Sequence, residues 1–163
     1  MKLRNMLKGL DLDTMSMTVT KDRIPEVEKW LGMKLGPQLK EYILEYSCLC
    51  SDEMDDPFLS IVDELGEKND MVTYTNLMRN RYRGTENYIM FEANAMDEVD
   101  AVVDGADNVF YIDARENAIV DAGLKLFDYM YLRLKYGEWV FMDDEERAEV
   151  EMSPKDRRRY AKA

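Results

Sequence analysis

The hydrophobic period of this 163-residue chain changes twice, and these changes most restrict the folds that it can adopt. Between residues 24 and 46, apolar side chains recur every three or four positions, as in amphipathic helices. Between residues 88 and 120 they occur in short, partly alternating runs separated by turn residues, a pattern typical of antiparallel strands. Helical spacing returns from Leu124 to Leu134. This order predicts an α+β fold with an antiparallel sheet of about four to six strands and helices packed mainly on one face.

The same patterns predict the individual elements. Pro25 in a first helical turn and Gly32 as a stop favour a helix over residues 22–31, and Pro37 opens the next one. Residues 58–62 (FLSIV) suit either a short strand or a helical turn, and residues 1–21 a short helix followed by an extended segment. The other predicted helices cover residues 37–46, 74–82, 124–136 and part of 143–152, and the predicted strands cover 88–92, 99–103, 108–113 and 118–120, with Gly123 ending the last.

The chain contains no histidine, and this absence narrows its chemistry. It removes Ser-His-Asp and Cys-His nucleophiles, histidine metal ligands and the usual general base near neutral pH. Cys48 and Cys50 are too close for an ordinary disulfide and too few for a zinc site, so we expect two small buried side chains. Neither residues 52–56 nor residues 104–113 have the ligand spacing of a calcium loop. We therefore expect no catalytic residue, no metal and no cofactor, although chemistry that uses carboxylates alone stays open.

Acidic residues outnumber basic ones, and the formal net charge is −12. Residues 41–70 hold ten acids and one lysine, and residues 92–128 hold ten acids, one arginine and one lysine. Such clusters either form a solvated surface that keeps the protein in solution or mimic phosphates and bind a basic partner. The same charge disfavours nucleic acid as a partner. The candidate partner-binding residues are the densest cluster, Asp52, Glu53, Asp55 and Asp56, followed by Asp97, Glu98 and Asp100.

The two ends of the chain carry basic residues. Residues 153–163 contain five basic residues and one acid, which could contact nucleic acid, fold back onto the acidic protein or stay a mobile end. Arg4, Lys8 and Asp11 interrupt any signal-peptide core near the amino terminus. No apolar run approaches the roughly 20 residues of a membrane span. We expect a cytoplasmic protein that binds neither membrane nor nucleic acid.

Several segments, in this order, resemble the SMI1/KNR4 family, also called the SUKH superfamily. Residues 24–46 (IPEVEKWLGMKLGPQLKEYILEY) are similar to its amino-terminal signature, with Leu31 and Gly32 in the Leu-Gly pair and residues 40–44 in the following helix. Residues 108–113 (NVFYID) are similar to a late family strand, and residues 124–134 (LKLFDYMYLRL) to the closing helix. Tyr74, Thr75, Leu77 and Arg79 lie where the family often has a helix before its central strands.

The resemblance covers roughly residues 22–136 of a single domain, 1–163, with an amino-terminal segment, 1–21, and a carboxy-terminal extension, 138–163. It implies a non-catalytic protein-binding module. Bacterial members of this family are mostly immunity proteins that neutralise toxins such as nucleases. The expected partner is therefore a toxin domain with a basic surface. Two alternatives stay open: a regulatory scaffold of the same fold that binds a host protein, and a carboxylate-dependent hydrolase.

Overall fold

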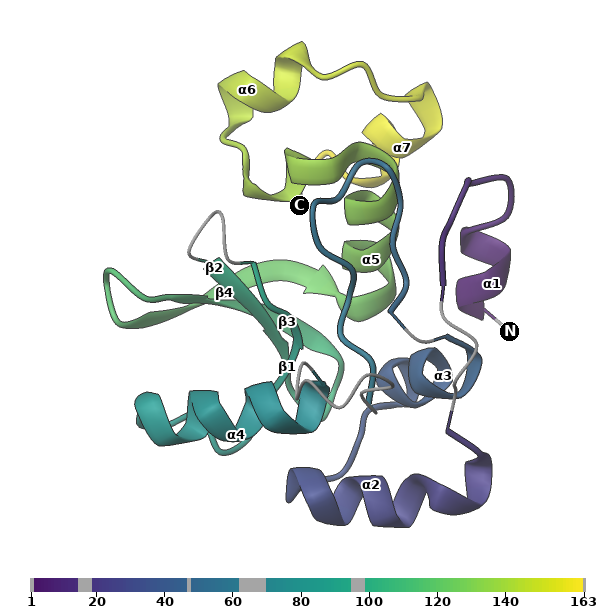
Figure 1. Cartoon of the computed structure of the whole chain (residues 1–163). Helices are drawn as coiled ribbons and strands as arrows, with labels where there is room; N and C mark the ends of the chain where they lie inside the picture. Colours follow the sequence, from purple (N-terminus) through teal and green to yellow (C-terminus); the bar gives the residue numbers. More distant parts are fainter. Residues whose placement is uncertain (1, 15–18, 47, 62–69, 95–98, 163) are drawn as a thin grey trace.

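The computed structural model describes residues 2–14, 19–46, 48–61, 70–94 and 99–162 (Figure 1). Within these residues the fold is α+β, with a four-stranded antiparallel sheet in the order β1-β2-β3-β4. The strands are β1 (Ile89–Glu92), β2 (Val99–Val103), β3 (Asn108–Asp113) and β4 (Ala118–Lys125). The helices are α1 (Lys2–Met6), η1 (Lys21–Arg23), α2 (Ile24–Leu31), α3 (Pro37–Glu45), α4 (Met71–Arg81), α5 (Leu126–Tyr136), η2 (Gly137–Phe141), α6 (Asp144–Glu149) and α7 (Pro154–Arg159). The predicted fold class is confirmed.

The end of α2 and the start of α4 show how well local sequence signals predict where a helix begins and ends. Helix α2 ends at Gly32, whose left-handed conformation (φ 69°) lets its N–H close the last turn, as the sequence predicted. Helix α4 begins at Met71, three residues before its predicted start. Its N-cap is Asp70, whose carboxylate accepts a hydrogen bond from the Thr73 N–H at 2.7 Å. This cap satisfies one of the free amide groups of the first turn and so extends the helix backwards.

Strand β4 is longer than predicted. It continues beyond Gly123 to Lys125, which pairs with Asn108 of β3 after a shift in register. Gly123 adopts a positive φ of 72°, and the Asp121 carboxylate accepts its N–H at 2.8 Å. The glycine therefore bends the strand at an irregularity instead of ending it. Because β4 leads directly into α5, this bend sets the direction in which that helix starts (Figure 1).

The outer edge of the sheet, strand β1, is covered by α4 and by the segment 58–61. The Met90 N–H donates to the Thr75 hydroxyl at 3.0 Å, and the Leu59 N–H donates to the Phe91 carbonyl at 2.8 Å. Residues 58–61 form neither the strand nor the helical turn that the sequence allowed for residues 58–62, and Val62 lies outside the described residues. They run as an irregular segment beside the edge. These hydrogen bonds occupy backbone N–H and C=O groups of β1 that could otherwise pair with a strand of another chain.

Aromatic side chains form the centre of the core between α3, α5 and the sheet. Phe58 contacts Tyr42, Phe91 and Tyr129, with ring centroids 6.0–6.5 Å apart. The predicted burial of Tyr42, Ile43 and Phe127 is confirmed, with exposed fractions of 0–2%. Tyr131, predicted to be buried as well, is half-buried because its hydroxyl reaches outwards to Asp156 of α7.

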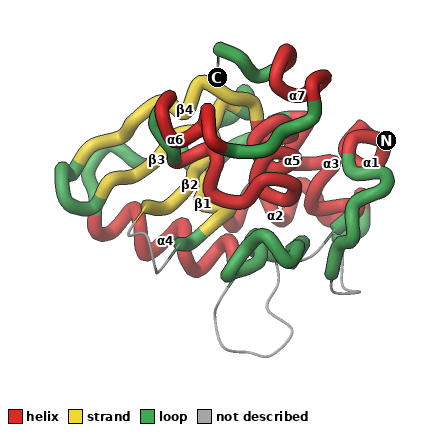
Figure 2. Tube along the Cα trace, turned by 90° about the horizontal axis from the view of Figure 1, so that it is seen from above, coloured by secondary structure: helices red, strands yellow, loops and turns green. Residues whose placement is uncertain are grey.

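The basic carboxy-terminal end folds back onto α5, one of the three outcomes that the sequence left open. The Asp156 carboxylate is 4% exposed and accepts hydrogen bonds from Tyr131, Tyr136 and Lys135 of α5 at 2.6–2.9 Å. Asp128 accepts further bonds from Arg159 and Tyr160. Figure 2 shows α7 at one end of the molecule, away from α4. Asp156, the single acid of this basic segment, therefore holds the segment on α5.

Candidate functional site

The acidic loop, residues 52–56, is fastened to the body of the protein by Ser51, which directly precedes it, and by its apolar member Met54. The Ser51 hydroxyl donates to the Leu134 carbonyl near the end of α5 at 2.7 Å, and Met54 is buried. The loop backbone also contacts Gly137 so closely that a Cβ there would lie 2.8 Å from the Glu53 carbonyl oxygen. The loop thus has a defined position on the end of α5.

All four carboxylates of the acidic loop are exposed. Among the residues that the structure describes, no lysine or arginine lies within 4.0 Å of them as an ion-pair partner. Four negative charges in five residues repel one another. The loop therefore presents a concentrated negative charge on a positioned backbone.

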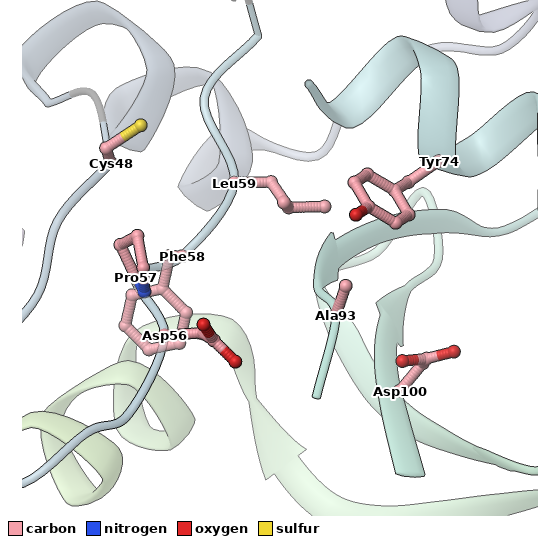
Figure 3. Close-up of a pocket in the computed structure, with 8 residues that line it drawn as sticks. All are labelled: Cys48, Asp56, Pro57, Phe58, Leu59, Tyr74, Ala93 and Asp100. Carbon is pink, nitrogen blue, oxygen red and sulfur yellow. The ribbon is translucent and has the colours of Figure 1, made fainter. Parts of the chain in front are cut away.

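A pocket of about 460 Å³ begins where the acidic loop ends (Figure 3). Its floor is largely apolar, and carboxylates lie on two of its sides: Asp56 comes from the acidic loop and Asp100 from β2. The sequence placed these two residues in separate clusters, and the fold brings them to one pocket. The remaining lining residues are Cys48, Pro57, Phe58, Leu59, Tyr74 and Ala93.

Asp100 is held in place at this pocket. Its carboxylate accepts a hydrogen bond from the Asn94 N–H at 3.1 Å, just after the end of β1. Burial raises the pKa of Asp100, and this effect exceeds the opposing stabilisation of the charged form by the Asn94 bond and the positive charge of Arg81. A cation placed in the pocket would therefore stabilise the charged form of Asp100 more than it would stabilise that of an exposed aspartate.

A buried ion pair lies next to the backbone on which the acidic loop packs. The Arg133 guanidinium of α5 lies 3.0 Å from the Glu92 carboxylate of β1, and both side chains are at most 5% exposed. Tyr129 donates its hydroxyl to the same carboxylate, and Arg133 also donates to the Gly137 carbonyl at 2.9 Å. The loop contacts this same Gly137. The pair thus joins the sheet, α5 and the backbone on which the loop packs.

Sequence reasoning missed this pair, although both residues interrupt apolar runs. Glu92 ends the strand run YIMFE, and Arg133 lies inside the apolar stripe LFDYMYLRL. A charged residue inside a buried stripe indicates a buried partner, because an unpaired charge there is costly. Which acid pairs with Arg133 depends on the contact between α5 and β1, 41 residues apart.

The other predicted site residues have different positions. Asp52, Glu53 and Asp55 belong to the exposed loop and do not line the pocket. Asp97 and Glu98 lie outside the described residues. The two cysteines are free and half-buried, not buried as expected, and Cys48 contributes to the pocket wall.

The described part of the chain contains no group of three or more histidine, cysteine, aspartate or glutamate side chains arranged to hold a metal ion. Within the same residues, no helix has the length and apolar character needed to cross a bilayer. No protein-family model matches the chain, and no curated protein matches it. The likeness to the SMI1/KNR4 family therefore stays a prediction.

Proposed function

We propose that this protein is a non-catalytic binding module that captures and neutralises a protein with a basic surface, as a toxin-immunity protein does. One observation carries the proposal: an exposed acidic loop, without an ion-pair partner among the described residues, is fastened to α5 and ends at a largely apolar pocket that has Asp56 and Asp100 on its sides. Exposed charge speeds the encounter with a basic partner, and a pocket supplies the buried centre that an interface needs.

A lysine or arginine of the partner suits this pocket. Its aliphatic stem can pack on Pro57 and Leu59, while its charged head meets Asp56 and Asp100. The raised pKa of Asp100 supports this role, because a cation would stabilise its charged form. The loop charges would then govern the association rate, and the pocket contacts would govern dissociation.

The experiment is to look for a secreted toxin domain encoded beside this gene, to co-express the chain with any such domain, and to measure binding kinetics with the purified pair. We expect the chain to restore growth. Neutralising Asp52, Glu53, Asp55 and Asp56 together as Asn or Gln should slow association about tenfold or more at low salt. The matched control neutralises four exposed acids in and after α6, namely Asp144, Glu145, Glu149 and Glu151, and should bind at nearly the original rate.

Failure to restore growth would favour the scaffold alternative, in which the partner is a host protein. If the loop variant associates with the partner at the original rate at low salt, the acidic loop is not part of the interface. Its charge would then serve only to keep the protein in solution.

A carboxylate-dependent hydrolase is the second candidate, and the pocket is the observation that favours it. Asp100, whose pKa burial raises, and Asp56 lie on two sides of this pocket, and hydrolases use pairs of carboxyl groups as acid and base. Turnover of a nitrophenyl glycoside or phosphodiester that is lost in Asp100→Asn would replace the binding proposal. We expect no turnover.

A further inference from the structure

A second cavity, remote in sequence from the acidic loop, has the opposite charge. This groove of about 640 Å³ lies between α1, α5 and α7, which Figure 1 shows on the side of the molecule away from α4. Five cationic side chains and only one acid line it, although the whole chain carries a net charge of −12. The cations are Lys2, Lys8, Lys135, Lys155 and Arg159, and the acid is Asp156.

The single acid does not neutralise the groove. The Asp156 carboxylate accepts hydrogen bonds from Tyr131 and Tyr136 and pairs with Lys135 at 2.9 Å. Arg159 pairs with Asp128 at 3.0 Å. These bonds hold two of the cations in place and engage the carboxylates of Asp156 and Asp128, while the Glu41 carboxylate accepts the backbone N–H groups of Lys2 and Leu3.

The other three cations have no such partner. Lys2, Lys8 and Lys155 are exposed, and no carboxylate of the described residues lies within 4.0 Å of their ammonium groups. They come from two segments about 150 residues apart, and the fold places them around one cavity. Like charges gathered in this way repel one another, and an anion among them would relieve that repulsion.

We propose that this groove binds a small multivalent phosphate, free or as part of a nucleotide. Three exposed ammonium groups match several phosphate oxygens, and lysine is a common phosphate-binding residue. The volume lies within the range of small-molecule sites. A long nucleic acid fits less well, because beyond a Debye length of about 8 Å it would meet the acidic remainder of the surface.

This inference does not rest on the proposed partner binding, since no residue lines both cavities. The test is calorimetric titration of the full chain with inorganic tripolyphosphate. We expect one binding event at low ionic strength that weakens at about 0.15 M salt. Substituting Lys8→Gln and Lys155→Gln together should weaken binding about tenfold or more, because two charge-assisted contacts are lost.

The matched control is Lys21→Gln with Lys29→Gln, which removes two exposed lysines of η1 and α2 that do not line the groove. It should bind tripolyphosphate with unchanged affinity, and thermal melts should show both variants folded. ATP and adenosine distinguish the source of the phosphate. ATP that binds more tightly than tripolyphosphate identifies a nucleotide, equal affinity identifies the phosphate chain alone, and adenosine should not bind.

Three results would overturn the proposal. Tripolyphosphate could give no binding heat at low ionic strength. The control variant could lose as much affinity as the groove variant, which would show that overall charge and not the groove matters. A single-stranded oligonucleotide could bind more tightly than tripolyphosphate, which would identify a polymer as the ligand.

Discussion

Removing Arg133 while keeping Glu92 tests whether the buried ion pair holds the sheet, α5 and the acidic loop together. Methionine at position 133 keeps most of the side-chain volume and removes the charge. Among the described residues, the Glu92 carboxylate, whose side chain is 2% exposed, would then keep only the Tyr129 hydroxyl as a hydrogen-bond partner. An uncompensated buried charge of this kind costs about 3–5 kcal/mol. This loss is a large part of the roughly 5–15 kcal/mol by which domains are stable.

The pH dependence of this loss identifies its cause. Burial already raises the pKa of Glu92 above its ordinary value, against the opposing effect of Arg133, and removing Arg133 raises it further. An acid whose pKa is higher in the folded state loses stability as pH rises from its unfolded to its folded pKa. The deficit of Arg133→Met relative to the original protein should therefore shrink between about pH 7.5 and about pH 5.

The assay is urea unfolding followed by circular dichroism and tryptophan fluorescence at both pH values. A second variant, Arg133→Met with Glu92→Gln, removes both charges and should recover about 2 kcal/mol or more of the loss. A deficit that is equal at both pH values, together with no recovery in the double variant, would refute the reasoning. The loss would then come from packing and not from the unpaired buried charge of Glu92.

Three further perturbations test other parts of the fold. Gly36→Ala should cost about 1–3 kcal/mol in urea unfolding, because its Cβ would lie 2.2 Å from the Asp107 carboxylate, which accepts the first amide groups of α3. Phe127→Ala, at a side chain that is 2% exposed, should cost about 3–5 kcal/mol in the same assay. Burial opposes ionisation of Asp156, but bonds led by the Tyr136 hydroxyl outweigh it and lower its pKa to about 2. Its stabilising effect should be complete above pH 3.8 and lost as pH falls towards 2, and melts of Tyr136→Phe should show a weaker dependence across this range.

The sequence by itself determined the local elements and their order. Helical spacing with Pro25 and Gly32 placed α2, Pro37 placed α3, and alternating apolar runs placed β1 to β3, because these signals depend on neighbours within a few residues. The charge of the acidic loop could also be read directly, since exposure follows from four adjacent carboxylates that no core can accept. Local reasoning failed at Gly123, where a glycine that resembled a strand end is a bend within β4.

Only the tertiary structure decided which distant residues meet. It joined Asp56 and Asp100 in one pocket, paired Glu92 with Arg133, and gathered lysines from both ends of the chain around one groove. None of these contacts produces a periodic pattern in the sequence, because each depends on how α5 packs against the sheet, the acidic loop and α7. The same long-range packing docked the basic tail on α5 through its single acid, Asp156, since a buried carboxylate must find donors wherever the fold supplies them.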